Sequence, residues 1–187
     1  MARWDPDAKG RLVKAALALF DEHGYDATTV AQIAEAAGLT KRTFFRYFAD
    51  KREVLFDGSR ELERLWVSGI EAAPADAGPM AAVSAGLDEV ARLFADRQPF
   101  ARTRARVIAA NPELRERELI KLQTLAGAVE AALAERGLPP GRAALAAQAG
   151  ITVFHAAFTR WLEQDDPAAL GRLVGESLSQ LRSVTAG

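Results

Sequence analysis

Apolar side chains recur at intervals of three and four positions along almost the whole of this 187-residue chain. That spacing belongs to one face of an α-helix, and no stretch shows the strict alternation that indicates a half-buried β-strand. We therefore predict an all-α fold. Glycine and proline residues mark where one helix stops and the next begins, and they divide the chain into about nine helices.

The first 52 residues predict three short helices. Gly24 ends the first helix, and Thr29 and Gln32 have the spacing of a capping box at the start of the second. Gly38 ends that second helix, and Thr40 is placed to cap the third. A helix, a turn containing glycine and a second short helix together predict a helix-turn-helix motif.

The rest of the chain predicts a longer helical part. Asp50 is placed to cap a fourth helix that runs to a break at residues 72–80. Five further helices are predicted at about 79–97, 99–110, 112–136, 140–164 and 167–185. We expect two domains, a three-helix helix-turn-helix domain at residues 1–52 and a larger helical domain at residues 53–187.

Positive charge stands at the wrong end of the third helix. Lys41 and Arg42 directly follow the Thr40 cap, where the helix dipole is already positive, so each costs a few tenths of a kcal/mol in the free protein. The same helix end attracts phosphate through its free N–H groups. A broken local rule of this kind is typical of a functional site, and Lys51 repeats it directly after Asp50.

Aromatic residues are interleaved with these cations. Phe44 and Phe48 are four positions apart and are predicted to be buried, which leaves the cations and Phe45 on other faces. A run of charge is by itself more often a solvated surface. The helix-turn-helix spacing, together with exposed Phe45 and Tyr47, favours a nucleic-acid partner instead.

The stretch "ALALFDEHGYDATTVAQIAEAAGLTKRTFFRYFADKREVLF", within residues 8–58, resembles the TetR family of bacterial transcriptional regulators. The family pattern "GY…TTV..IA..AG.….TFYRYF..K..L" is matched over some 40 positions, and the all-helical remainder is also similar. The resemblance implies a homodimer that binds an inverted-repeat operator in double-stranded DNA. It also implies that the protein represses transcription and leaves the DNA when a small molecule binds the C-terminal domain.

Carried over by position, the resemblance implies two sets of DNA contacts. Backbone phosphates are expected to be held by Thr29, Thr40, Tyr47 and Lys51. The major groove is expected to receive Lys41, Arg42, Thr43, Phe45 and Arg46. The family usually has Tyr at the position of Phe45, so a phosphate hydrogen bond is lost there, and Phe45 could contact a thymine methyl group instead. Weaker candidates for DNA contact are Gln32, Arg3, Lys9, Arg11 and Lys14.

The C-terminal domain is expected to supply dimerisation and ligand sensing. The resemblance implies a homodimer interface on the last two helices, and the small residues of 140–164 permit close approach of helices. A mostly apolar effector pocket could be lined by Leu62, Trp66, Phe94, Phe100, Arg104, Ile108, Phe154 and Phe158. For any one of these residues, plain core packing is the alternative.

The arginines of the stretch 100–122 bear on the effector. Arg102, Arg104 and Arg106 are spaced by two, so they cannot share one helix face, and an inward-pointing arginine needs an anion. That anion is either part of the effector or one of Glu89, Asp96 and Glu113. The segments "RARVIAANPELRER" and "RWLEQ" are similar to a TetR subgroup thought to bind acyl-CoA-like ligands, and other apolar or amphipathic effectors suit the composition equally well.

Other function classes fit less well. With two histidines, no cysteine and no Gly-rich phosphate loop, the sequence predicts no enzyme, no cofactor and no metal site. No apolar stretch is long enough to cross a membrane and the start lacks a signal peptide, so a cytoplasmic protein is expected. The alternative is a helical ligand-binding or protein-interaction module whose DNA-reading head has degenerated.

Overall fold

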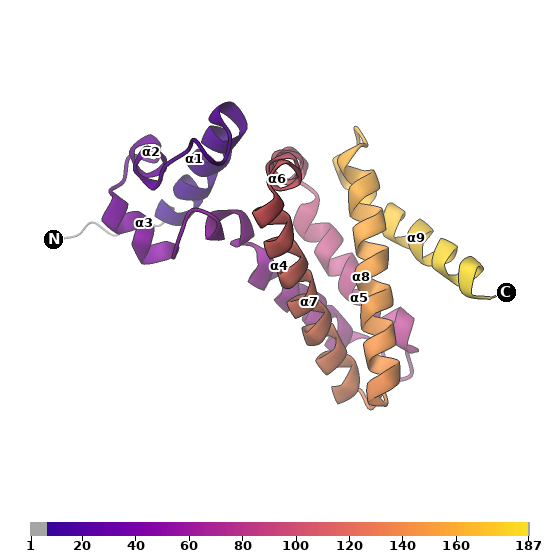
Figure 1. Cartoon of the computed structure of the whole chain (residues 1–187). Helices are drawn as coiled ribbons and strands as arrows, with labels where there is room; N and C mark the ends of the chain where they lie inside the picture. Colours follow the sequence, from indigo (N-terminus) through magenta and orange to yellow (C-terminus); the bar gives the residue numbers. More distant parts are fainter. Residues whose placement is uncertain (1–6, 187) are drawn as a thin grey trace. The chain divides into compact units, whose positions relative to one another are not determined.

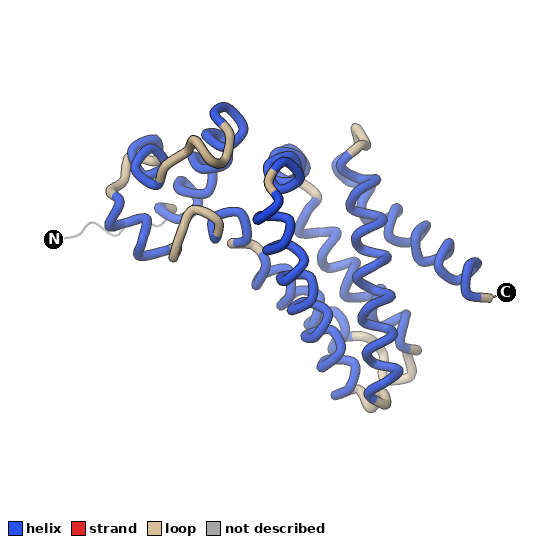
Figure 2. The backbone as a smooth tube through the Cα atoms, in the orientation of Figure 1, coloured by secondary structure: helices blue, strands red, loops and turns tan. Residues whose placement is uncertain are grey.

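The computed structural model describes residues 7–186. Within that range every regular element is helical, as Figures 1 and 2 show, so the all-α prediction is confirmed. The α-helices are α1 (Ala8–His23), α2 (Val30–Ala36), α3 (Lys41–Tyr47), α4 (Ser59–Ala72), α5 (Pro79–Phe94), α6 (Gln98–Ala110), α7 (Pro112–Glu135), α8 (Pro140–Leu162) and α9 (Leu170–Thr185). Two short 3-10 helices, η1 (Glu53–Phe56) and η2 (Pro167–Ala169), precede α4 and α9.

Two glycines end the first helices as predicted. Gly24 follows α1 with φ 84° and Gly38 follows α2 with φ 65°. Both values lie in the left-handed region, which glycine reaches without the steric cost of a Cβ atom. These two positions reverse the chain so that α2 and α3 follow α1 closely.

The fourth helix starts later than predicted. The Asp50 carboxylate does accept hydrogen bonds from the N–H groups of Arg52 (2.8 Å) and Glu53 (3.1 Å), but the element that follows is only the 3-10 helix η1, whose N-cap residue is Arg52. Three successive residues of η1, Val54, Leu55 and Phe56, are all buried. All three side chains enter the hydrophobic cluster that also contains residues of α1, α2 and α3. The α-helix begins only at Ser59, directly after Gly58, and glycine is a poor helix former.

The described residues up to Gly58 form one compact unit with residues 100–118. We call this the reader unit. It contains most of α6 and the start of α7, so it does not end at the domain boundary predicted after residue 52. Val107, Ile108 and Leu114 bring the later segment into the hydrophobic cluster of α1–α3 and η1. The other buried members of that cluster are Leu12, Ala16, Leu17, Phe20, Tyr25, Ile33, Ala37, Phe44, Phe48, Val54, Leu55 and Phe56.

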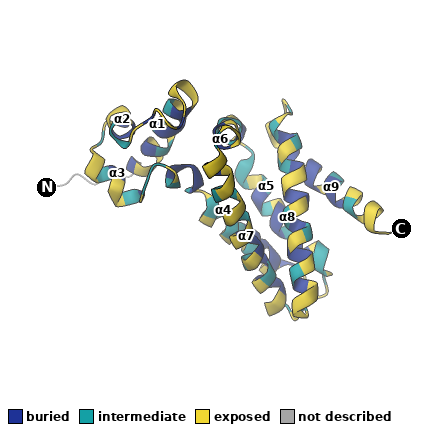
Figure 3. Cartoon of the chain, viewed as in Figure 1, coloured by how far each residue is buried: buried dark blue, intermediate teal, exposed yellow. Residues whose placement is uncertain are grey.

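The second compact unit, the sensor unit, comprises residues 59–99 and the described residues from 119 onward. In it α4 packs against α5, α8 packs against α9, and α5 contacts both α8 and α9. Each long helix has one buried and one exposed face (Figure 3). Gly69 and Gly86 permit the close approach of α4 and α5, because a Cβ on Gly69 would lie 2.6 Å from the Cα of Gly86.

None of the described helices combines the length and the apolar character that crossing a membrane requires.

Candidate nucleic-acid interface

The start of α2 carries the capping box that the sequence predicts. The Gln32 backbone N–H donates to Thr29 Oγ1 (3.3 Å), and the Thr29 backbone N–H donates to Gln32 Oε1 (2.8 Å). Thr29 Oγ1 also donates to Gln32 Oε1 (2.8 Å). Both side chains are exposed. The geometry fixes the direction in which α2 leaves the preceding turn.

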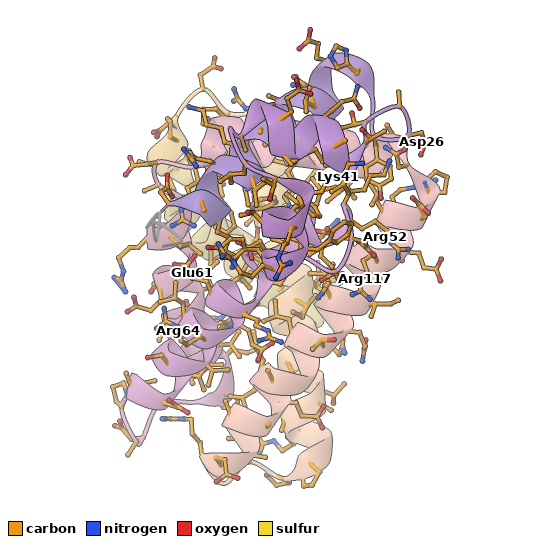
Figure 4. The ribbon with its side chains drawn as sticks, turned by 90° about the vertical axis from the view of Figure 1, so that its left-hand side faces the viewer. Asp26, Lys41, Arg52, Glu61, Arg64 and Arg117 are labelled. Carbon is orange, nitrogen blue, oxygen red and sulfur yellow. The ribbon has the colours of Figure 1, made fainter. Side chains whose placement is uncertain are left out.

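The start of α3 is capped in a simpler way. Thr40 Oγ1 accepts a hydrogen bond from the Thr43 backbone N–H (3.2 Å) and lies 3.1 Å from Thr43 Oγ1. Lys41 and Arg42 follow this cap, and both are exposed. Figure 4 labels Lys41 on α3. In the described part of the chain no carboxylate lies in salt-bridge range of either cation, so nothing there offsets the unfavourable helix dipole.

The three phenylalanines in and just after α3 divide as predicted, but Tyr47, predicted to be exposed, is partly buried against the hydrophobic cluster. Phe44 and Phe48 are buried, and Phe45 is 56% exposed. The Phe45 ring meets the Phe44 ring edge to face, with centroids 5.5 Å apart. The Arg46 guanidinium lies 4.9 Å from the centre of the Tyr47 ring and donates to the Tyr47 hydroxyl (3.1 Å). Lys41, Arg42, Phe45 and Arg46 are thus exposed side chains of one seven-residue helix.

Lys51 is placed differently from the cations of α3. Its Nζ donates to the backbone carbonyls of Tyr25 (2.7 Å), Thr28 (3.0 Å) and Asp26 (3.3 Å). These residues form the turn between α1 and α2, and Figure 4 labels Asp26 there. Lys51 is expected to bind a phosphate, but its ammonium group already donates to three backbone carbonyls.

Three titratable groups near Lys51 have shifted pKa values, and the hydrogen bond to Asp50 raises the pKa of one of them, Arg52. Partial burial raises the pKa of Asp50, but hydrogen bonds from the Arg52 side chain and from two backbone N–H groups outweigh it, so the pKa falls below its ordinary value. Burial raises the pKa of the Tyr25 phenol, and Glu113 acts in the same direction.

Arginines hold residues 100–118 to the rest of the reader unit. Arg106 pairs with Asp21 (2.9 Å), and Arg117 pairs with Glu53 (2.5 Å). Arg104 points inward and donates to the Leu55 carbonyl (2.6 Å) and to Glu118 (2.7 Å). The inward arginine was expected from the spacing. Its partner is Glu118 rather than Glu89, Asp96 or Glu113, and an ion pair already satisfies its charge.

The candidate effector residues divide between the two units. Phe100, Arg104 and Ile108 belong to the reader unit, and the other five belong to the sensor unit. In the sensor unit four aromatic side chains form a chain of ring contacts with centroids 5.1–5.6 Å apart, namely Trp66, Phe154, Phe158 and Phe94. Trp161 joins this aromatic cluster, and Leu62 on α4 is partly buried.

One polar atom of the aromatic cluster has no partner. Trp66 is fully buried, and its indole Nε1–H makes no hydrogen bond. A Cβ on Gly86 or on Gly150 would lie within 3.4 Å of this indole, so both glycines give the ring its space. An unpaired buried donor is uncommon in proteins and is expected to find an acceptor in some state.

The last two helices carry both a charged cluster and exposed apolar side chains. Glu176 on α9 accepts hydrogen bonds from Arg160 on α8 (2.7 Å) and from Arg172 (2.6 Å). Leu145 on α8 and Val184 on α9 are 74% and 82% exposed.

The weaker DNA candidates near the N-terminus have mixed positions. Lys9 pairs with Asp57 (2.5 Å), whereas Arg11 and Lys14 are exposed on α1. Arg3 lies outside the described residues.

Both the N-terminal and the C-terminal part of the chain match profiles of known protein families. The profile of "Bacterial regulatory proteins, tetR family" matches residues 12–57, and the profile "MftR C-terminal domain" matches residues 77–186. The chain is 41% identical over 76 residues to TcmR, an HTH-type transcriptional regulator of Streptomyces glaucescens. That match covers 41% of this chain and 34% of TcmR, so the chain spans about a third of the length of this relative.

Solved structures share the fold over nearly the full chain. A TetR-family transcriptional regulator from Mesorhizobium loti superposes with a TM-score of 0.57 at 22% identity, covering 96% of each chain. FadR from Bacillus subtilis, solved in complex with stearoyl-CoA, gives a TM-score of 0.60 at 22% identity over 89% of this chain and 95% of FadR. With one family profile on its N-terminal helices and a second across residues 77–186, this chain belongs to the TetR family of bacterial regulatory proteins, which are not enzymes.

Proposed function

We propose that this protein is a transcriptional regulator that binds double-stranded operator DNA through α2 and α3. The observation that carries the proposal is the pair of exposed cations, Lys41 and Arg42, at the positive end of α3 with no carboxylate partner in the described chain. A DNA phosphate supplies the missing counter-charge, and the exposed Phe45 beside them gains an apolar contact in the groove.

The proposed contacts fall into two groups. Lys41, Arg42, Thr43, Phe45 and Arg46 enter the major groove, where α3 is short and exposed. The hydroxyl groups of Thr29, Thr40 and Tyr47 hold the backbone phosphates on either side. Groove contacts determine which sequence is bound, and phosphate contacts set the register of the protein on the duplex.

The protein acts as a homodimer in this proposal. Two copies of one helix-turn-helix motif read two half-sites about one helical turn apart, which makes the operator an inverted repeat. The interface is assigned to α8 and α9, whose exposed Leu145 and Val184 give it apolar side chains to bury. A protein that acts on bacterial operators works in the cytoplasm.

The sensor unit binds an apolar or amphipathic effector beside the aromatic cluster. Phe94 and Phe158 are partly exposed and offer apolar surface. A ligand that enters the cluster as far as the buried Trp66 gains its unpaired N–H as a donor for a polar group. FadR, which shares the fold, was solved with stearoyl-CoA, so acyl-CoA-like molecules are the first class to test. Effector binding lowers operator affinity, as in a repressor, and by linkage the operator lowers effector affinity by the same factor.

Selection of bound fragments from random duplex DNA tests the central claim. The expected result is an inverted repeat, bound with an affinity that falls steeply as salt rises because each neutralised phosphate releases counterions. If the selected fragments share no sequence, and low salt gives only uniform weak binding or none, the regulator proposal fails. Effector binding without sequence preference in DNA would identify instead a ligand-binding module with a degenerate head.

A further inference from the structure

We propose that Lys51 is a positioning residue that fastens the turn before α2 and thereby sets the direction of the DNA-reading helices, instead of binding a phosphate. The proposal rests on the proposed function, because its effect is read out as operator affinity. Lys51 lies 23 to 26 residues after the carbonyl groups that it contacts. It thus joins the segment that follows α3 to the turn that precedes α2.

The contacts account for every proton of the ammonium group. A lysine Nζ carries three N–H donors and no acceptor. The three carbonyl oxygens of Tyr25, Asp26 and Thr28 lie 2.7, 3.3 and 3.0 Å from Nζ. A phosphate could be bound with full hydrogen bonding only if the ammonium left these carbonyls.

An aromatic ring confines the same group from another side. Lys51 Nζ lies 4.2 Å from the centre of the Tyr25 ring. That ring is 3% exposed and packs on Phe20, with centroids 5.1 Å apart. A cation above a buried ring is stabilised by the ring quadrupole, which adds to the three hydrogen bonds.

The side chain of Thr28 also holds this turn in place. Thr28 is buried, and its Oγ1 donates to the carbonyls of Gly24 (2.8 Å) and Leu19 (3.2 Å). The next residue, Thr29, opens the capping box of α2. Lys51 and Thr28 therefore fix the turn immediately before the first residue that is proposed to hold a phosphate. A shift of this turn moves Thr29 and the N-terminus of α2 with it.

Replacement of lysine by arginine separates the two roles. Lys51→Arg keeps the positive charge, but no guanidinium nitrogen carries more than two N–H groups, so none can donate to all three carbonyls as Nζ does. A phosphate-binding residue tolerates this change, with affinity and salt dependence near those of the wild type. A positioning residue does not, so operator affinity is expected to fall at least tenfold while the slope of log affinity against log salt stays unchanged.

Lys41→Met gives the reference for a cation of the DNA interface, since a cation that displaces one counterion from the DNA contributes about 0.9 to that slope. Lys51→Arg, Lys51→Met and Lys41→Met are all measured with the full chain, by fluorescence anisotropy on the selected operator, well below the melting temperature. If Lys51→Arg binds like the wild type and Lys51→Met shows the slope change of Lys41→Met, Lys51 is a phosphate contact and the proposal is overturned.

A double-mutant cycle with Thr29→Ala tests whether Lys51 acts through α2. If it does, the affinity losses of Lys51→Arg and Thr29→Ala are not multiplicative, and the double variant loses less than their product. A purely global loss of stability leaves the affinity of the folded protein unchanged. Multiplicative losses, or unchanged affinity, contradict the proposed route.

Hydrogen exchange of the free protein keeps this inference separate from the proposed function. Lys51→Arg is expected to speed amide exchange in residues 28–36 while leaving the sensor unit unchanged. If the wild type shows no sequence preference in DNA, the proposed function fails, and exchange still reports on the turn. Unchanged exchange in residues 28–36 overturns the positioning role even when DNA binding is confirmed.

Discussion

Gly86 lies directly against the indole ring of Trp66, so that a Cβ atom on Gly86 would overlap Trp66 Cδ1 and the Trp66 carbonyl oxygen. Trp66 belongs to α4 and Gly86 to α5. The contact lets the two helix backbones approach each other closely, and Trp66, one of the two tryptophans of the aromatic cluster, is completely buried.

Gly86→Ala is therefore expected to destabilise the sensor unit by about 1–3 kcal/mol, because an added methyl group in a packed core forces side chains and backbone to shift. The matched control is Gly127→Ala in α7, where an added Cβ meets nothing within 4 Å. The control is expected to stabilise the helix by roughly 0.5–1 kcal/mol. Urea denaturation measures both changes, and equal effects would contradict the steric account.

Phe45 is expected to recognise thymine through its methyl group. Its ring is 56% exposed, so Phe45→Ala should leave the fold intact. Replacing single thymines of the selected operator by uracil removes one methyl group each. We expect wild-type affinity to fall at one such position in each half-site and the affinity of Phe45→Ala to be insensitive there. If every thymine can be replaced without effect on the wild type, Phe45 makes no methyl contact.

Stability is expected to depend on pH through Glu176. Hydrogen bonds from Arg160 and then Arg172 lower the pKa of this carboxyl below its ordinary value of 4.5. A lowered folded-state pKa contributes stability above the ordinary pKa and loses it as pH falls through the folded-state value. Glu176→Gln should therefore melt below the wild type at pH 7, and the difference should shrink below about pH 4.5. A constant difference between pH 7 and pH 3 would exclude this carboxylate as the cause.

Gln98 is expected to contribute to stability through its amide group. It is 3% exposed, and its Nε2 donates to the carbonyls of Trp161 (2.8 Å) and Gln164 (3.0 Å), at the C-terminal end of α8. Gln98→Ala removes both hydrogen bonds and should cost about 1–3 kcal/mol, since one intramolecular hydrogen bond contributes about 0.5–1.5 kcal/mol. The Trp161 carbonyl keeps its hydrogen bond from the Gln164 backbone N–H (3.1 Å). The exposed Gln148 on α8 gives the control, because Gln148→Ala should change the free energy of unfolding little. Thermal unfolding measures the loss of stability in the two variants. Equal losses would contradict a stabilising role for the buried amide of Gln98.

Local features of the reader unit could be predicted from sequence because their partners are neighbours. The capping box at Thr29 and Gln32, the glycine after each of the first two helices, and the burial of Phe44 are all confirmed. Each depends on residues no more than four positions apart, where helix geometry decides which groups meet.

Contacts between distant segments could not be predicted in this way. The ammonium of Lys51 meets the Tyr25 carbonyl, and Arg106 meets Asp21 across 85 positions. Helical periodicity indicates which face of α6 is buried but not which helix covers it. For the same reason the sequence does not show which of the predicted effector residues lie together. The structure divides them between the two units.

The chain passes between the two units three times, after Gly58, after Pro99 and after Glu118. The reader unit is thus built from two separate stretches of sequence, and its hydrophobic interior is incomplete without Val107, Ile108 and Leu114. A single cut after α3 would therefore not give a DNA-binding unit that can be moved to another protein. A chimaera that exchanges operator specificity between relatives must either transplant residues 100–118 as well or confine its changes to exposed positions of α2 and α3.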